Sequence, residues 1–101
     1  MADSQEGTIT IYKYPFPIRD QVAIEMPEGA KVLRVGLQRV IAANAAYDQP
    51  VLWAQVNTAA PTRIYRFLLF GTGHLLPHEE LEHVATFDQG PFVWHMFVDP
   101  S

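Results

Sequence analysis

Apolar and polar residues alternate with the period of a β-strand along three stretches in the first half of the chain. In residues 8–14, Ile9 and Ile11 fall on one face and two tyrosines fall on the other. The same period of two recurs in residues 20–27 and 31–41. Successive side chains of a strand point to opposite faces, and β-branched and aromatic residues favour strands. The pattern therefore predicts three strands in this half.

Four further apolar stretches follow, at residues 51–57, 63–70, 83–88 and 91–98. The second and the last are apolar on both faces, which is typical of strands in the interior of a sheet. The last two are separated only by a short segment around Asp88-Gln89-Gly90, which predicts a hairpin. We expect four strands here, with 63–70 and 91–98 away from the sheet edges.

Two connections have ambiguous patterns. In residues 41–49, four alanines favour a helical turn, whereas Asn44 and Asp48 favour a loop. We expect a long loop there, with room for one turn of helix. Residues 76–83 could hold one helical turn with Pro77 at its first position, but the segment is too short to be a stable helix without packing.

These elements predict an all-β fold of mainly antiparallel strands, arranged as a compact sandwich or barrel of about seven short strands with at most one or two short helical turns. The 101 residues suffice for a single core, so we expect one domain over 8–101 behind a flexible tail at 1–7. The predicted core contains the aromatic residues Phe67, Phe87, Phe92, Trp94 and Phe97.

Composition narrows the classes of function. Charged residues make up 18% of the chain and the net charge is −4, so a nucleic-acid partner is not expected. There is no cysteine, which excludes disulfides and cysteine nucleophiles, and no apolar run approaches the ~18 residues of a membrane span. The low charge and the two-sided apolar strands predict a homo-oligomer, with a dimer favoured.

Several short motifs together resemble a known family. They are Tyr12-Lys13-Tyr14-Pro15 with Pro17-Ile18, Ile24-Glu25-Met26-Pro27 with Gly29-Ala30-Lys31, Leu52-Trp53-Ala54, Phe70-Gly71-Thr72-Gly73-His74, and Val93-Trp94-His95 with Phe97. In this order they resemble small proteins of unknown function encoded by tailed bacteriophages and prophages. The resemblance implies a phage accessory protein in the host bacterial cytoplasm, and it assigns no catalytic residue. Residues 41–49 depart from it, because this chain is longer there.

The segment Gly71-Thr72-Gly73-His74 ends an apolar strand and has two interpretations. It lacks the further glycines or the Gly-Lys-Ser/Thr ending of the known phosphate-binding loops. Two glycines suit a sharp bend, in which at least one has a positive φ. The alternative is a ligand site, with Arg34 and Arg66 adding positive charge and the N–H groups of residues 72–74 converging on an anion.

Neither metal nor catalytic chemistry follows from the polar residues. The histidines at 74, 78, 83 and 95 and the glutamates of 79–82 form no recognised zinc spacing, so no metal and no cofactor are expected. Thr72 with His74 is the only nucleophile–base pair near in sequence, and two residues of separation make it a weak pair. We therefore expect no catalytic residue and no enzyme.

The leading functional interpretation is a non-enzymatic protein-interaction module that binds a host or phage protein, for instance inhibiting a host defence or metabolic protein. Its expected interaction surface consists of Tyr12, Tyr14, Phe16, Glu79 and Glu80. One alternative is a protein that sequesters a nucleotide-type ligand through Gly71–His74. Another is a minor component of the virion or of its assembly.

Overall fold

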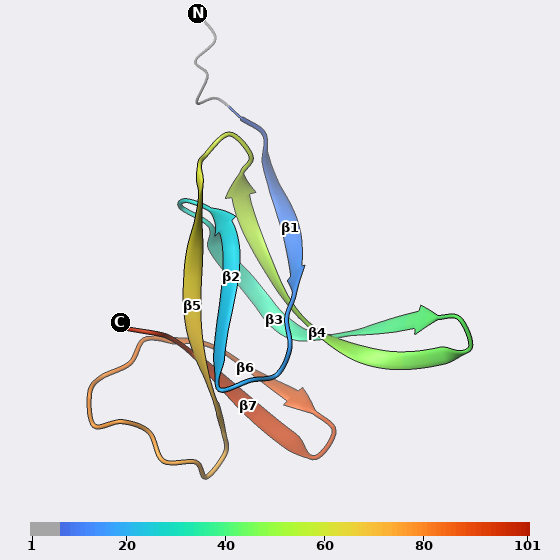
Figure 1. Cartoon of the computed structure of the whole chain (residues 1–101), viewed down its shortest axis with the longest axis vertical. Coiled ribbons are helices and arrows are strands. Elements are labelled where there is room, and N and C mark those ends of the chain that lie inside the picture. Colours follow the sequence, from blue (N-terminus) through green and yellow to red (C-terminus); the bar gives the residue numbers. More distant parts are fainter. Residues whose placement is uncertain (1–6) are drawn as a thin grey trace, which may run out of the picture.

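The computed structural model describes residues 7–101, which form seven antiparallel strands (Figure 1). The strands are β1 (Ile9–Pro15), β2 (Gln21–Pro27), β3 (Lys31–Ala42), β4 (Ala45–Asn57), β5 (Thr62–Gly71), β6 (His83–Gln89) and β7 (Phe92–Val98). The predicted all-β, antiparallel class is confirmed. Residues 7–101 contain no helix of the length and apolarity that crossing a membrane requires. The expected tail lies outside the described residues except for Gly7.

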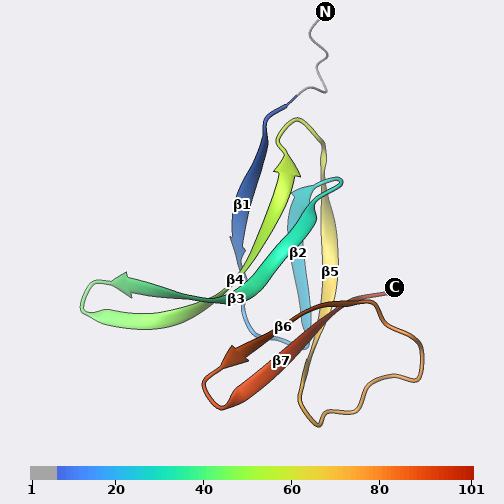
Figure 2. The same cartoon turned by 180° about the vertical axis from the view of Figure 1, so that it is seen from behind.

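The strands form two sheets that pack face to face and do not close into a barrel. Sheet A has the order β1-β4-β3, and sheet B has the order β2-β5-β7-β6. Figures 1 and 2 show the chain crossing from one sheet to the other after β1, after β2 and after β4. As their two-sided apolar patterns predict, β5 and β7 are interior strands of sheet B.

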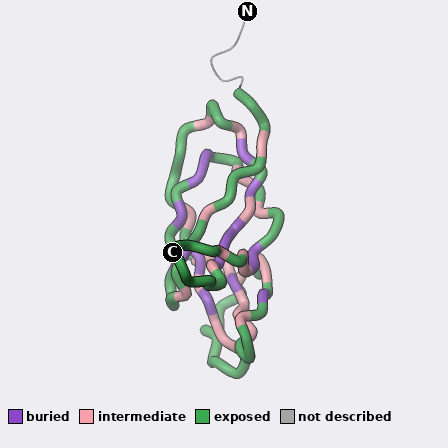
Figure 3. Tube along the Cα trace, turned by 90° about the vertical axis from the view of Figure 1, so that its right-hand side faces the viewer, coloured by how far each residue is buried: buried purple, intermediate pink, exposed green. Residues whose placement is uncertain are grey.

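The core lies between the two sheets, and Figure 3 shows the buried residues along the strands that form it. Buried side chains of both sheets contact one another there: Val22, Ile24, Met26, Val35, Leu52, Ala54, Val56, Phe67, Leu69, Phe87 and Met96. The predicted core residues Phe67 and Phe87 are buried as expected, and Trp94 packs against this cluster from a partly buried position. Interdigitation of two inner faces is the usual basis of a β-sandwich.

Three aromatic residues lie elsewhere than the sequence pattern predicts. Phe16, expected on an interaction surface, is 2% exposed in the core, with its ring 6.1 Å from that of Phe87. Phe16 belongs to the segment that crosses from β1 to β2, and this crossing directs it between the sheets. Phe92, expected in the core, is 59% exposed beside the β6–β7 turn. Phe97, also expected in the core, points to the outer face of sheet B and is only partly buried.

Residues 41–49 are not a loop. Strands β3 and β4 continue to Ala42 and Ala45, and residues Gln38–Gln49 pair in register as a two-stranded ribbon, which we call the arm. Its turn is Ala43-Asn44, with Ala43 at φ 53°. Figure 1 shows the arm extending to the right, beyond the body of the molecule. The alanines that suggested a helical turn are strand and turn residues, because pairing with the opposite strand overrides their weak helix preference.

Candidate functional site

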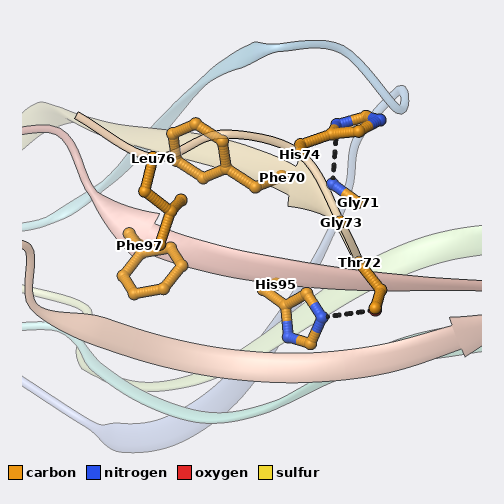
Figure 4. Close-up of a pocket in the computed structure, with 8 residues that line it drawn as sticks. All are labelled: Phe70, Gly71, Thr72, Gly73, His74, Leu76, His95 and Phe97. Carbon is orange, nitrogen blue, oxygen red and sulfur yellow. Dashed lines mark hydrogen bonds between the residues drawn. The ribbon is translucent and has the colours of Figure 1, made fainter.

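An open pocket of about 270 Å³ lies on the outer face of sheet B, where β5 and β7 meet the loop of residues 72–82. Its lining is shown in Figure 4 and consists of Phe70, Gly71, Thr72, Gly73, His74, Leu76, His95 and Phe97. Four of these are the Gly71–His74 segment that the sequence marks as a turn or a ligand site. The pocket is therefore the candidate functional site of the described chain.

The apolar side of the pocket is built by strand pairing. Phe70 on β5 pairs with His95 on β7. Leu68, two residues earlier on β5, pairs with Phe97. All of these point away from the core, because the alternate residues of β5 and β7 fill it. The rings of Phe70 and Phe97 meet edge to face, with centroids 5.8 Å apart. Figure 4 shows Leu76, from the loop, beside both rings.

The Gly71–His74 segment is a tight turn. The His74 N–H donates to the carbonyl oxygen of Gly71 at 3.0 Å, and Gly73 has φ 91°. A positive φ at the third position of such a turn requires glycine or asparagine. The predicted positive-φ glycine is thus confirmed at Gly73.

The turn does not direct its amides at an anion. The Thr72 N–H donates to the Val93 carbonyl at 3.1 Å, and the His74 N–H is used within the turn. Of the three amides of Thr72, Gly73 and His74, only that of Gly73 has no hydrogen-bond acceptor among the described residues. A cradle of three converging amides is therefore not formed by this backbone.

The His74 side chain completes the turn. Its Nδ1 accepts a hydrogen bond from the Gly71 N–H at 3.1 Å, which places the proton of a neutral ring on Nε2. The ring folds back over Gly71, where a Cβ would come within 3.1 Å of it. The His74 ring also lies edge to face with the Trp94 ring, with centroids 6.4 Å apart. A glycine at position 71 therefore leaves room for the His74 ring. A glycine at position 73 is needed because the backbone there has a positive φ.

A chain of three hydrogen bonds forms the polar side of the pocket. Thr72 Oγ1 lies 2.8 Å from His95 Nε2, His95 Nδ1 lies 3.0 Å from Thr86 Oγ1, and Thr86 Oγ1 lies 2.9 Å from His83 Nε2. Each hydroxyl donates once and accepts once in such a chain, so the protons can all point from Thr72 to His83 or all the other way. Thr72 Oγ1 can therefore present a lone pair to the pocket in the first direction. In the second direction it has a proton to donate, and the Val93 carbonyl oxygen, 3.5 Å away, competes for that proton.

Sequence proximity paired Thr72 with His74, but the structure pairs it with His95. The partner comes from β7, 23 residues away, and Thr86 reaches His95 because the two are register partners in the β6–β7 hairpin. The hairpin turn is Gly90-Pro91, one residue later than expected. A sequence prediction with the turn at Gly90-Pro91 would have paired Thr86 with His95. No local signal would have brought Thr72 to them.

The two arginines assigned to a ligand site lie apart from each other. Arg66 is on β5 and points to the same outer face as Phe70. Arg34 is on β3 in sheet A, with its guanidinium 5.4 Å from the centre of the Trp53 ring. Arg34 is therefore not brought to Gly71–His74.

The expected interaction surface is also divided between the sheets. Tyr12 and Tyr14 lie on β1 in sheet A, with ring centroids 6.4 Å apart, and Glu79 and Glu80 are exposed in the loop beside sheet B. Burial, followed by the neighbouring Tyr12, raises the pKa of Tyr14 above its ordinary value of 10.0. Phe16 is in the core. The five residues do not form one patch.

The described part of the chain contains no cluster of side chains that could bind a metal ion. Among residues 7–101, no three or more His, Asp or Glu side chains are placed so as to hold an ion. The site instead offers an apolar floor, a hydroxyl–imidazole chain and one free amide, which is suited to binding an uncharged molecule.

Comparison with known proteins places the chain in a family. A model of a domain of unknown function, DUF7352, matches residues 8–101, which is most of the sequence. The chain belongs to the DUF7352 family. No curated protein and no solved structure matches it. The DUF7352 family is uncharacterised, and this member of it has an all-β fold.

Proposed function

We propose that this DUF7352 protein is a non-enzymatic protein-interaction module that docks on a partner protein through the arm. The observation that carries the proposal is the tip of the arm, residues 40–47. Its sequence, Val-Ile-Ala-Ala-Asn-Ala-Ala-Tyr, contains no charged residue, and residues 41–48 are all exposed. The last charges before the tip, Arg39 and Asp48, face each other at 3.8 Å and offset one another.

An uncharged ribbon of this kind is poorly suited to remain alone in water. An isolated two-stranded hairpin is only marginally stable, and exposed apolar residues gathered in one element mark interaction sites. Ile41 is 78% exposed on one face of the ribbon, and Tyr47 is 49% exposed on the other. Both faces can therefore be covered at once if the tip enters a groove of its partner.

The biological setting is a further part of this proposal. The ordered motifs resemble those of tailed-phage and prophage proteins, so we place the protein in the cytoplasm of an infected bacterium. There a host defence or metabolic protein is the partner that the arm would engage and inhibit. A second copy of the chain is the other expected partner, since the charge content is low.

A shortened arm tests the proposal. Arg39 and Asp48 are directly paired, so replacing residues 40–47 with Asn-Gly closes β3 and β4 with a two-residue turn of the preferred kind. We expect this variant to keep the strand signal and cooperative unfolding of the full chain, because residues 41–47 are all exposed and Val40 is only partly buried.

Affinity capture from bacterial lysate, followed by quantitative mass spectrometry, then compares the full chain, the shortened variant and Ile9→Asp. Ile9 is 60% exposed on β1 and is a matched apolar control outside the arm. The proposal predicts proteins that are retained by the full chain and by Ile9→Asp, and lost with the shortened variant. Equal capture by all three would contradict a role for the arm.

A further inference from the structure

We propose that the pocket on the outer face of sheet B binds an uncharged nucleobase with a ring-amide edge, that is, an N–H next to a carbonyl. Uracil, thymine, hypoxanthine and guanine have this edge. The proposal does not depend on the arm. It identifies the base, and not a phosphate, as the group that the Gly71–His74 segment recognises.

The shape and apolarity of the pocket favour a flat ring. Two phenyl rings, Phe70 and Phe97, form one side, and the half-exposed Leu76 lies against them. Every nucleobase has an apolar face that packs on aromatic side chains. A volume of about 270 Å³ is slightly below the usual range for small-molecule pockets, so it suits a base with little more than its sugar.

The charges around the pocket favour a neutral ligand. None of its eight lining residues is Asp, Glu, Lys or Arg, and the chain as a whole carries −4. Two of the three amides that would hold a phosphate already donate to the carbonyls of Val93 and Gly71. Of these three amides an anion would find only that of Gly73 free, and no lining cation, whereas a neutral ring needs no opposite charge in the pocket.

The polar side of the pocket has the complementary pattern for a ring amide. The free Gly73 N–H donates to the carbonyl oxygen of the base, and a lone pair of Thr72 Oγ1 accepts the adjacent ring N–H. Thr72 then donates its own proton to His95 Nε2, His95 Nδ1–H donates to Thr86, and Thr86 donates to His83 Nε2. In this arrangement both hydroxyls donate one hydrogen bond and accept one, and both ring nitrogens of His95 have a partner.

The alternative direction of the chain gives a different preference, which makes the choice of base informative. With all protons reversed, Thr72 offers its hydroxyl proton, and the pocket presents two donors. Cytidine and adenosine have no ring N–H beside a carbonyl and cannot use the first arrangement. A preference for uridine over cytidine therefore reports the Thr72-to-His83 direction.

The test is a titration of the ¹⁵N-labelled full chain with free nucleosides, followed by two-dimensional NMR. We expect uridine and inosine to shift the amide signals of Thr72, Gly73 and His74 at millimolar concentration, and cytidine to bind about tenfold more weakly because one hydrogen bond is lost. Uridine monophosphate should bind no more tightly than uridine, and inorganic phosphate should leave the signals unchanged.

Two variants distinguish apolar contact with the face of the base from hydrogen bonding to its edge. Thr72→Val keeps the shape of the side chain and the backbone hydrogen bond to Val93, and it should abolish the difference between uridine and cytidine. Leu76→Ala should weaken both nucleosides by the same factor. Thr62→Val, on the same strand but outside the pocket, is the control that should change neither.

Three results would overturn the proposal: no shift with any nucleoside, a preference that survives Thr72→Val, or binding that requires the phosphate. The last would show an anion site in place of a base site. Wild-type-like spectra of both pocket variants outside residues 70–76 and 93–97 confirm that they remain folded.

Discussion

At the scale of single residues, backbone geometry decides what the polar groups of the pocket can do. Gly73 turns the chain with φ 91°, and this bend brings Thr72 to His95 and leaves one amide free. A Cβ at Gly73 would meet no atom within 4 Å, so space does not require glycine there. Its requirement is conformational. The residues that give the site its chemistry therefore depend on one that has no side chain.

Gly73→Ala tests this dependence. An alanine held at positive φ costs about 1–2 kcal/mol, so the free energy of unfolding in urea should fall by that amount. His74→Ala is the comparison, because it removes only an exposed side chain and its hydrogen bond, and should cost about 0.5–1 kcal/mol. An unchanged midpoint for Gly73→Ala would mean that the turn readily adopts another conformation.

At the scale of elements, the arm is the part of the fold that its own sequence supports least. Eight uncharged residues, four of them alanine, extend two strands beyond the point where sheet A packs on sheet B. The turn adds strain, since Ala43 is a non-glycine residue at φ 53°. Hairpin turns with positive φ normally use Gly, Asn or Asp. The arm is thus a weakly stabilised element that a partner would complete.

Ala43→Gly should stabilise the arm. Relief of the positive-φ cost exceeds the extra entropy of glycine in the unfolded chain by roughly 0.5–1 kcal/mol. Amide hydrogen exchange measured by NMR should then slow about two- to fivefold in residues 38–49, while β5 in the core exchanges as before. Faster exchange in the arm of the variant would contradict the strain at Ala43.

At the scale of the whole molecule, the shape is more extended than the chain length requires. The radius of gyration is 15.6 Å, whereas a compact domain of about 100 residues has roughly 13 Å. The arm accounts for this larger radius, because it extends well beyond the rest of the molecule in both Figure 1 and Figure 2. A projecting, uncharged element on a protein with few charges is a reason to expect association.

We therefore predict a dimer or larger oligomer in solution. Light scattering at micromolar concentration and above should give a mass greater than that of one 11.4 kDa chain, and the mass should decrease on dilution. The variant with Asn-Gly in place of residues 40–47 should remain monomeric over the same range. A monomer mass independent of concentration for the full chain would contradict the prediction.

The sequence by itself determined the fold class and the existence of all seven strands, because a period of two with β-branched and aromatic residues is a local property. It did not predict that β4 begins at Ala45. It also predicted that 63–70 and 91–98 are interior strands, since both of their faces are apolar. It indicated a glycine with positive φ between Gly71 and His74, because two closely spaced glycines after a strand have few other uses.

Only the tertiary structure decided which faces became the core and which residues met. Phe16 and Phe97 are equally apolar. The crossing of the chain between sheets buries Phe16, whereas the register of β7 with β5 directs Phe97 to the outer face. Thr72 and His95 are 23 residues apart, and strand pairing brings them within 2.8 Å. Residues 41–49 have no strand pattern alone, and they extend because the opposite strand supplies their hydrogen bonds. Each outcome depends on contacts between different segments of the chain, which the periodicity of a single segment does not encode.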